Sequence, residues 1–220
     1  MLDQKTVIVT GANGALGRAV CEVAEELGAS TIRLDIVFSD KADNCHEVDL
    51  TDPDAVSTLL DGLGSFDAVL NIAGGFAMGE PAHGADDAQW DKMFALNVTT
   101  LRNTVKAAVP LMLANGGGSI VNIGAYGARE GQADMSAYCA SKSVVMRLTE
   151  SLANELRDKG INVNAVLPTV IDTPVNREGM PDADYSAWVN PRDLANVICF
   201  LASDAASAVH GALVPVRGLS

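Results

Sequence analysis

The sequence predicts an α/β fold of the Rossmann type: a doubly wound, mostly parallel sheet of about seven strands, flanked by helices in three α/β/α layers. Short apolar runs rich in β-branched residues alternate with longer stretches of helical periodicity along the chain. The first of these runs leads through a glycine-rich turn into a helix. The chain has 220 residues, of which 48% are hydrophobic, so residues 1–220 are expected to form one domain.

The composition argues against several classes of function. The formal net charge of −13 disfavours nucleic acid and anionic membranes as partners. No apolar run approaches the length of a membrane span. The three histidines lie far apart without metal-ligand spacing, so no metal is expected. The four cysteines form no Cys-x-x-Cys pair, and the first strand leaves no room for a signal peptide, which favours reduced thiols in a cytoplasmic protein.

The first predicted strand, Thr6–Val9, leads into the glycine-rich turn. Glycines follow at Gly11, Gly14 and Gly17, and a helix-like stretch continues from Arg18 to Leu27. Glycines let the backbone turn tightly and approach a pyrophosphate, which binds at the positive N-terminus of a helix. This context predicts a nucleotide site, with a purely structural turn as the alternative. The residues expected to contact the nucleotide here are Gly11, Asn13, Gly14, Ala15 and Leu16.

The second predicted strand, Thr31–Asp35, ends on a carboxylate about 20 residues beyond the glycines. Asp35 can accept hydrogen bonds from a ribose diol and would repel a 2′-phosphate, so NAD(H) is favoured over NADP(H). Ile36 is expected in the same site, and a solvated Asp35 is the alternative. A short third strand over Cys45–Asp49 follows too closely for a full crossover helix.

The remaining strands are predicted over Ala68–Ile72, Ser119–Ile123, Asn162–Leu167 and Gly211–Val216. The remaining helices are predicted to start near Asp52 and to cover Asp86–Ala114, Ser136–Lys159 and Pro191–Ser203. Small residues after the fourth strand, Ala73-Gly74-Gly75, allow a ligand to approach the carboxyl edge of the sheet.

The chemistry is predicted to depend on a phenol and an ammonium four positions apart. Tyr138 and Lys142 share one face if their segment is helical. A nearby positive charge favours the phenolate and lowers the pKa of the phenol, which suits proton transfer in carbonyl–alcohol or imine–amine chemistry. Asn97 is a polar residue on an otherwise apolar helical stripe, and a capped or water-bound core asparagine is the alternative there.

In this order and spacing, the motifs resemble those of the short-chain dehydrogenase/reductase family along nearly the whole chain. The matching motifs are Thr10-Gly11 with the glycine turn, Asp35, Asp49-Leu50, Asn71-x-Ala73-Gly74, Asn97, Tyr138-x-x-x-Lys142 and Pro168-x-x-Ile171-x-Thr173.

The resemblance implies a role for each matching residue. Tyr138 would be the proton donor and acceptor, Lys142 would hold the nicotinamide ribose and lower the pKa of Tyr138, and Asn97 would position a proton-relay water. Homodimers or homotetramers through the two long helices are also implied. The further cofactor contacts implied are Asp49 and Leu50 at the adenine, Ile171 and Thr173 at the carboxamide, and Asn71, Ala73, Gly74 and Pro168.

The chain departs from the family pattern thirteen residues before Tyr138, where a serine usually holds the substrate carbonyl. That position is Ala125, and the candidates to replace the missing hydroxyl are Tyr126, Ser136 and Ser141. Losing one hydrogen-bond donor to a developing oxyanion can cost about 10²–10³ in rate. Other departures are Ala15, in place of a frequent glycine, and Thr169, where glycine usually follows proline.

These departures resemble the dihydropteridine reductase branch of the family. So do Gly14–Gly17, Ala73–Phe76 and the stretch from Asp172 to Trp188, whereas Asn97 follows the wider family. The narrower resemblance implies NADH-dependent reduction of a quinonoid dihydropterin. Such a ring is electron-poor and needs little polarisation, so Tyr138 and Lys142 would suffice.

Two classes of function are therefore expected. The first is an oxidoreductase that transfers hydride to a C=O or C=N group of a small molecule, either a quinonoid pterin or a small ketone or alcohol. The second is a nucleotide-sensing or scaffold protein, which the missing serine favours and the Tyr138–Lys142 pair opposes. Substrate contacts are expected from Ala125, Tyr126 and Trp188, the last in a substrate-covering loop of residues 175–190. The alternative is that the aromatic residues of this loop only pack it onto the domain.

Overall fold

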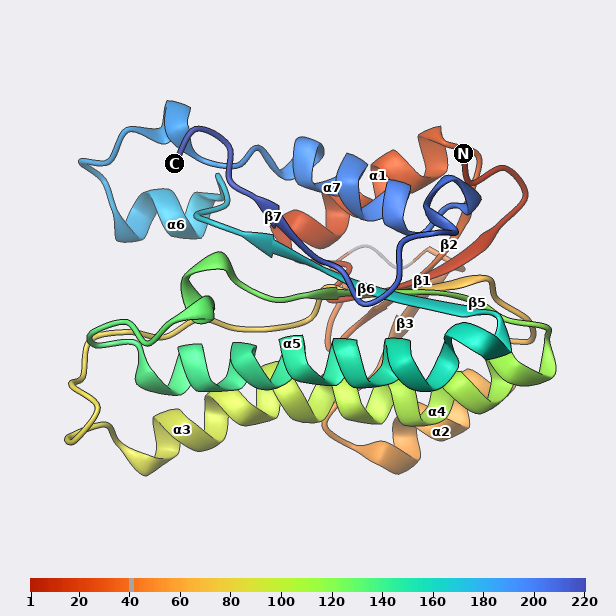
Figure 1. Cartoon of the computed structure of the whole chain (residues 1–220), viewed down its shortest axis with the longest axis horizontal. Helices are drawn as coiled ribbons and strands as arrows, with labels where there is room; N and C mark the ends of the chain where they lie inside the picture. The colour runs from red at the N-terminus through yellow and green to blue at the C-terminus, as the bar shows by residue number, and fades with distance from the viewer. Residues whose placement is uncertain (40–41) are drawn as a thin grey trace.

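The computed structural model describes residues 1–39 and 42–220 and has the predicted three-layer α/β/α architecture (Figure 1). Seven strands form one fully parallel sheet in the order β3-β2-β1-β4-β5-β6-β7. The strands are β1 Thr6–Thr10, β2 Ser30–Asp35, β3 Cys45–Glu47, β4 Ala68–Asn71, β5 Gly118–Ile123, β6 Ile161–Pro168 and β7 Leu213–Val216. The helices are α1 Ala15–Glu26, α2 Pro53–Gly62, α3 Asp87–Phe94, α4 Thr100–Ala114, α5 Ser136–Leu156, α6 Pro174–Gly179 and α7 Pro191–Leu201.

Helices cover both faces of the sheet. Figure 1 shows α1 and α7 on one face, and α2, α4 and α5 on the other. Alternate residues of a strand point to opposite faces, and β1 follows this rule. Val7 and Val9 join the buried cluster under α1 and α7, whereas Ile8 joins the cluster under α2, α4 and α5. The short apolar run of β1 is therefore buried on both sides, as in a parallel sheet.

The strand order reverses between β1 and β4, which lie side by side although β2 and β3 separate them in the sequence. Thr10 at the end of β1 is in register with Asn71 at the end of β4. Doubly wound sheets bind ligands outside the carboxyl ends of the strands at such a switch point. A ligand site is therefore expected at the loops after β1, β4 and β5.

The connection between β2 and β3 is short, and its described residues, 36–39 and 42–44, form no helix. Phe38 packs into the cluster under α1 and is only 8% exposed. Its backbone N–H donates to Oε1 of Glu47 over 3.1 Å. A single aromatic side chain thus covers sheet surface that a crossover helix usually covers, and the prediction of a minimal connection is confirmed.

Element boundaries differ from the predictions at several points. Helix α1 begins at Ala15 instead of Arg18, because Gly14 is its N-cap and accepts the N–H of Arg18 over 3.0 Å. The third strand ends at Glu47 instead of Asp49. The predicted helix over Asp86–Ala114 is continuous, but five of its residues, Ala95–Thr99, form a π-helical segment between α3 and α4.

Helix α6 was not predicted. It begins where Thr173 accepts the N–H of Asn176 over 3.2 Å and a proline occupies the first turn. None of the helices in the described part of the chain is both long enough and apolar enough to cross a membrane.

Candidate active site

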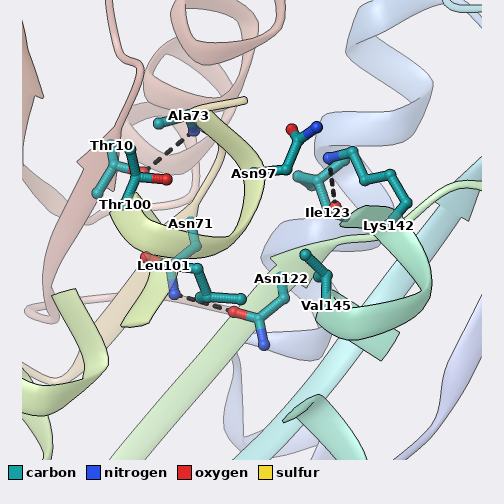
Figure 2. A pocket seen from close by; sticks show the side chains of 10 residues that line it. All are labelled: Thr10, Asn71, Ala73, Asn97, Thr100, Leu101, Asn122, Ile123, Lys142 and Val145. Atoms are coloured by element: carbon teal, nitrogen blue, oxygen red, sulfur yellow. Dashed lines mark hydrogen bonds between the residues drawn. The ribbon is translucent and has the colours of Figure 1, made fainter. Parts of the chain in front are cut away.

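The glycine turn after β1 lies tightly against the loop after β4. Gly11 has a φ of +63°, and a Cβ there would lie 2.8 Å from the backbone N and Cα of Ala73. The hydroxyl of Thr10 accepts the N–H of Ala73 over 3.1 Å, as Figure 2 shows. A Cβ on Gly17 would lie only 2.1 Å from the carbonyl oxygen of Gly11. Glycine is therefore required at both positions by backbone packing, which brings the N-terminus of α1 close to the switch point.

Asp35 lies beside this turn, as the sequence predicts. Its Oδ2 accepts the backbone N–H of Asn13 over 2.8 Å, and its Oδ1 accepts the N–H of Ile36 over 2.7 Å. The side chain of Asn13 donates to the carbonyl of Val37 over 3.0 Å. Ile36 is 68% exposed, which is unusual for a large apolar residue next to a buried strand. The arrangement fits an adenosine group, because it combines a fixed carboxylate with exposed apolar surface.

Asp49 and Leu50 lie after β3. Asp49 accepts the backbone N–H of Thr51 over 2.8 Å and the Thr51 hydroxyl over 2.7 Å, and these bonds lower the pKa of the Asp49 carboxyl. Leu50 is buried, and its carbonyl accepts the side-chain amide of Asn103 from α4 over 3.0 Å. Both residues are thus fixed in position, although exposed apolar surface comes from Ile36 and not from Leu50.

Lys142 is buried on α5, with only 6% of the residue exposed. Its Nζ donates to the carbonyl oxygen of Ile123, at the end of β5, over 2.8 Å (Figure 2). Burial disfavours the charged form and lowers the pKa of Lys142 to about 8. No ion pair of Lys142 is found within the described residues, so this ammonium is stabilised by a backbone dipole alone.

Tyr138 lies one turn earlier on α5 and is half-buried. Its ring meets the edge of Phe76 with the centroids 4.9 Å apart and the planes at 77°. Burial raises the pKa of Tyr138 to about 12, and no hydrogen bond of its hydroxyl is found among the described residues. The expectation that Lys142 lowers the pKa of Tyr138 is therefore wrong when only the groups of the protein act on the phenol. The reason is that the ammonium is bound to Ile123 while the phenol lies against an apolar ring.

Asn97 lies in the π-helical segment and is 2% exposed. Its Oδ1 accepts the N–H of Gly75 over 2.9 Å, and its Nδ2 donates to the carbonyl of Gly75 over 3.1 Å. Nδ2 also donates to the hydroxyl of Ser141 over 3.0 Å, and that hydroxyl donates to the carbonyl of Tyr138 over 2.8 Å. Asn97 thus connects the loop after β4 to the turn of α5 that carries Tyr138. Its carboxamide is already bonded by the protein at both ends.

Gly74 lies where Asn97 and Lys142 converge. A Cβ on Gly74 would come within 2.7 Å of the Asn97 Oδ1 and 3.3 Å of the Lys142 Nζ. The fold therefore brings three sequence-predicted residues from three different segments into contact. A side chain at this point would have to displace the Asn97 carboxamide from its bonds to Gly75.

A small cavity of about 10 Å³ is lined in part by Asn97 and Lys142 (Figure 2). Its volume matches a single water molecule. Asn71 donates through Nδ2 to the Oδ1 of Asn122 over 2.9 Å, but its own Oδ1 is buried without a hydrogen-bond partner among the described residues. The side chain of Asn71 is thus bound inside the sheet, next to β5. The residues lining the cavity are Thr10, Asn71, Ala73, Asn97, Thr100, Leu101, Asn122, Ile123, Lys142 and Val145.

Ala125 occupies the position of the missing serine and is 4% exposed. It belongs to a small apolar cluster with Cys139, Met146 and Leu167, against which Tyr138 also packs. Ser141 was expected as one possible replacement, but its hydroxyl is used by Asn97 and the Tyr138 carbonyl. The site therefore lacks the usual serine hydroxyl and does not regain it from Ser141.

The segment after β6 begins beside the site and forms a closed loop. Pro168 ends β6, and an isolated parallel bridge joins Ile171 to Val189. Thr173 caps α6 at the start of this loop. Figure 1 shows α6 extending beyond the end of the sheet, on the opposite side from α3.

Aromatic residues inside this loop contact one another. The rings of Tyr185 and Trp188 lie 4.8 Å apart, and the guanidinium of Arg177 lies 4.7 Å from the centroid of Tyr185. Arg177 also forms two hydrogen bonds with Asp172, of 2.6 and 2.8 Å, which lower the pKa of that carboxyl. These contacts favour the interpretation in which Tyr185 and Trp188 pack the loop.

A model of the family described as short chain dehydrogenase matches residues 5–184. The chain belongs to the short-chain dehydrogenase family. Its relatives include the cis-4-hydroxycyclohexanecarboxylate dehydrogenase of Sinomonas cyclohexanicum, which is 34% identical over 245 residues covering 98% of this chain and 96% of the relative. The galactitol 2-dehydrogenase of Rhizobium johnstonii is 33% identical over 98% of this chain and 94% of the relative.

Solved structures of short-chain dehydrogenases have the same fold. The ligand-free aldohexose dehydrogenase of Thermoplasma acidophilum superposes with a TM-score of 0.90 at 30% identity, covering 99% of this chain and 94% of that chain. A Beutenbergia cavernae structure with NADP bound at low occupancy has a TM-score of 0.89 at 28% identity, and the match covers 99% of this chain and 96% of that chain. The similarity to these dehydrogenases supports the family, but no dihydropteridine reductase is among the relatives described here.

The alignment with the Sinomonas cyclohexanicum enzyme has 245 positions, whereas the chain has 220 residues, so at least 25 positions have no counterpart. The short β2–β3 connection agrees with such a reduction.

Sequence reasoning missed three residues that contact the site, and it expected a different role for a fourth, Ser141. Phe76 lies on Tyr138, and Ser141 bonds both Asn97 and the Tyr138 carbonyl. Arg129 and Arg217 lie over the ring of Tyr126, at 5.0 and 4.7 Å from its centroid. A signal for Arg129 was its position four residues after Ala125, but Arg217 lies 91 residues from Tyr126 and no sequence pattern relates them.

Proposed function

We propose that this short-chain dehydrogenase uses NAD(H) to interconvert the alcohol and carbonyl forms of a small molecule. The observation that carries the proposal is the convergence of Gly74, Asn97 and Lys142 beside Tyr138, whose hydroxyl makes no bond within the described residues. A non-catalytic fold has no physical need for this combination. The names of two relatives, a hydroxycyclohexanecarboxylate dehydrogenase and a galactitol dehydrogenase, support an alcohol as the substrate.

The glycine turn and the residues that follow β2 are suited to bind a dinucleotide. Gly11, Gly14 and the first turn of α1 would hold the pyrophosphate, since the backbone there is tightly packed and presents helix N–H groups. Asp35 and Ile36 would bind the adenosine, and Lys142 would hold the nicotinamide ribose. The bound nicotinamide would supply or accept the hydride. Gly74 leaves room for close approach beside Lys142.

Tyr138 would give a proton to the carbonyl oxygen during reduction and take it back during oxidation. With a pKa near 12 among protein groups alone, its hydroxyl is protonated at neutral pH and suited to donation. Lys142 can carry a positive charge or lose it near pH 8. Turnover of any alcohol or ketone with NAD(H), lost in Tyr138→Phe, would support this assignment; turnover that survives the substitution would refute it.

The preference for NAD(H) over NADP(H) is proposed from Asp35. Its carboxylate is fixed by two backbone N–H groups beside the glycine turn, where it would repel a 2′-phosphate. Fluorescence titration with NADH and NADPH tests this directly. If NADPH binds more tightly than NADH, the proposal is contradicted. The substitution Asp35→Asn should reduce the difference in affinity between NADH and NADPH.

A second candidate reaction is the reduction of a quinonoid dihydropteridine. The observation that favours it is Ala125, which leaves the site without the usual hydroxyl for polarising a carbonyl. An electron-poor ring accepts hydride more readily than a ketone, so it depends less on such a donor. NADH oxidation assayed with quinonoid dihydropterin, ketones and quinones distinguishes the two candidates.

The same assay tests the alternative of a sensor or scaffold protein. Tight NADH binding with no turnover on any of these acceptors would favour the sensor. Tyr138 and Lys142 oppose it, because a sensor needs neither the phenol nor a buried ammonium beside the nicotinamide site.

Three further properties are proposed: a substrate-covering loop, self-association and a cytoplasmic location. Residues 175–190 would cover the substrate, because the loop begins at the carboxyl end of β6, near Thr173. Two copies or four would associate through α4 and α5, where Leu113 and Val144 are exposed. A cytoplasmic location would suit the four free cysteines. Analytical ultracentrifugation tests the association, since a monomer at micromolar concentration would contradict it.

A further inference from the structure

Two arginines lie on one aromatic ring next to the substrate side of the site. The guanidinium carbon of Arg129 is 5.0 Å from the centroid of Tyr126, and that of Arg217 is 4.7 Å from the same point. Both guanidinium groups are therefore within 10 Å of each other. This distance is only slightly more than one Debye length, which is about 8 Å at physiological ionic strength, so both charges act on an anion bound beside the ring.

Tyr126 connects this pair to the reacting end of the site. It follows Ala125 directly and begins the 3-10 helix Tyr126–Arg129. Tyr126 and Tyr138 both pack against the cluster formed around Ala125. The 3-10 helix is also held to α5, since Ser143 donates to the carbonyl of Ala128 over 3.0 Å. Arg129 thus lies on a segment that is held directly against α5.

Arg217 reaches this position from the other end of the chain. Its carbonyl accepts the Thr169 hydroxyl just after β6 over 2.9 Å. Two residues later, the N–H of Leu219 donates to the carbonyl of Ala187 in the 175–190 loop over 3.0 Å. Figure 1 shows the C-terminus beside this loop, near α6. The end of the chain therefore carries a positive charge to the segment proposed to cover the substrate.

Neither arginine is neutralised by a carboxylate side chain within the described residues. Arg217 donates through Nε to a main-chain oxygen of Ser220, the last residue of the sequence, over 2.8 Å, and through one terminal nitrogen to the Tyr126 hydroxyl over 3.5 Å. Arg129 and Arg217 are both exposed. By contrast, Arg33, Arg177 and Arg192 each pair with a carboxylate.

We propose that Arg129 and Arg217, stacked on Tyr126, bind the acidic group of the substrate, which is then an alcohol or ketone that also carries an anionic group such as a carboxylate. A guanidinium stacked on a ring keeps its in-plane N–H groups available, and these match the two oxygens of a carboxylate. The overall negative charge of the protein repels an anion, so local positive charge is needed to hold one. This proposal rests on the dehydrogenase function proposed above and narrows its substrate class.

Calorimetric titration of the full chain in the presence of NAD⁺ tests the proposal without requiring turnover. The ligands are cyclohexanecarboxylate, cyclohexanesulfonate and the neutral cyclohexanecarboxamide. We expect the carboxylate to bind about 10- to 100-fold more tightly than the carboxamide, the range for a charge-assisted hydrogen bond. The comparison with the sulfonate shows which oxyanion the site prefers. Raising the salt concentration should weaken the binding of the two anions and leave the binding of the carboxamide unchanged.

Arg217→Gln and Arg129→Gln should each reduce the preference for the acid over the amide about 10-fold, and Arg217→Lys should restore part of it. The matched control is Arg157→Gln, which removes the same charge from an exposed arginine after α5. Thermal unfolding of each variant confirms that it folds. Equal binding of acid and amide by the wild type, or an unchanged preference in both glutamine variants, would overturn the anion site.

Kinetics with NAD⁺ separate failure of this proposal from failure of the proposed function. With 4-hydroxycyclohexanecarboxylate and its carboxamide, the acid should have the lower KM, and the glutamine variants should raise that KM with little change in kcat. Turnover of neutral alcohols without any acid preference would refute the anion site and leave the dehydrogenase intact. Acid-specific binding that depends on the arginines, without turnover of any alcohol, would refute the dehydrogenase and leave the anion site intact.

Discussion

The two sides of the site are held together differently. Residues 10–17 and 35–36 are called the nucleotide side. Residues 125–129, 172–190 and 217–220 are called the substrate side. On the nucleotide side, backbone meets backbone: Gly11 packs on Ala73, and Gly17 on Gly11. On the substrate side, side chains from distant segments meet, as Arg217 does with Tyr126. The first kind of contact tolerates almost no substitution, whereas the second can change while the fold is kept.

The difference suits the two ligands. A dinucleotide presents the same pyrophosphate to every enzyme that uses it, so a fixed backbone is sufficient. A substrate differs between enzymes, and exposed side chains such as Arg129 and Arg217 can be replaced at small cost in stability. Lys142 and Tyr138 lie between the two sides, and burial disfavours the charged form of each, the ammonium of Lys142 and the phenolate of Tyr138.

The largest effect is expected from Gly17→Ala on the nucleotide side. The new Cβ would lie 2.1 Å from the Gly11 carbonyl oxygen. The clash can be relieved only by moving the backbone of the glycine turn, which costs more free energy than rotating a side chain. We expect loss of NADH binding and a fall in the free energy of unfolding of about 4 kcal/mol or more. Thermal unfolding and NADH fluorescence measure both.

Gly62→Ala is the matched control, because a Cβ there meets nothing within 4 Å. It should be neutral or stabilising by up to about 1 kcal/mol. Normal NADH binding by Gly17→Ala would show that the nucleotide side is more tolerant than its packing implies.

Tyr138→Phe should lower kcat by about 10²–10⁴-fold while NADH binding is retained. The ring and its contact with Phe76 remain, but the proton donor is removed. Stopped-flow measurement of hydride transfer separates this chemical effect from binding. A parallel loss of NADH affinity would indicate that the phenol acts on the nucleotide side instead.

Ala125→Ser should increase kcat/KM for a ketone or alcohol by up to about 10²-fold, because it restores a donor near the reacting oxygen. The gain should be much smaller for an electron-poor ring such as a quinonoid dihydropterin. Ala128→Ser is the control, since it adds a hydroxyl to another buried position of the same cluster. Equal gains in both variants would argue against a specific role for position 125.

Lys142→Met should abolish turnover and yet stabilise the fold by about 1–2 kcal/mol below pH 8. Burying the ammonium lowers its pKa from 10.5 to about 8, which corresponds to a cost of about 3 kcal/mol. The variant should regain only part of this, because it leaves the carbonyl oxygen of Ile123 without its partner. Urea denaturation from pH 7 to 9.5 measures the difference between variant and wild type.

The sign of the pH dependence follows from proton binding. Between about pH 8 and 10.5 the unfolded wild type holds a proton on Lys142 that the folded protein has released. The free energy of unfolding of the wild type therefore rises with pH in this window, and the advantage of the variant shrinks. Exposed Lys106→Met should show no such trend. A constant difference across the window would mean that Lys142 is not desolvated.

Much of the nucleotide side could be predicted because its requirements are local. The strand, the glycine spacing and Asp35 lie within 36 residues, and each has a steric or electrostatic reason visible in the sequence. Helix boundaries were less accurate, since Gly14 caps α1 earlier than its apolar pattern indicated. The π-helical segment around Asn97 had no sequence signal, because it occurs where that side chain bonds Gly75 and Ser141 from other segments.

The sequence by itself determined the fold class, the parallel sheet, the nucleotide turn and the placing of Tyr138 and Lys142 on one helix face. These follow from periodicities of two and 3.6 residues and from the sterics of glycine. Only the tertiary structure decided that the Lys142 ammonium binds Ile123, that the pKa of Tyr138 is raised, and that Arg217 reaches Tyr126. Burial and contacts between distant segments set these properties, and neither exists until the sheet has brought the segments together.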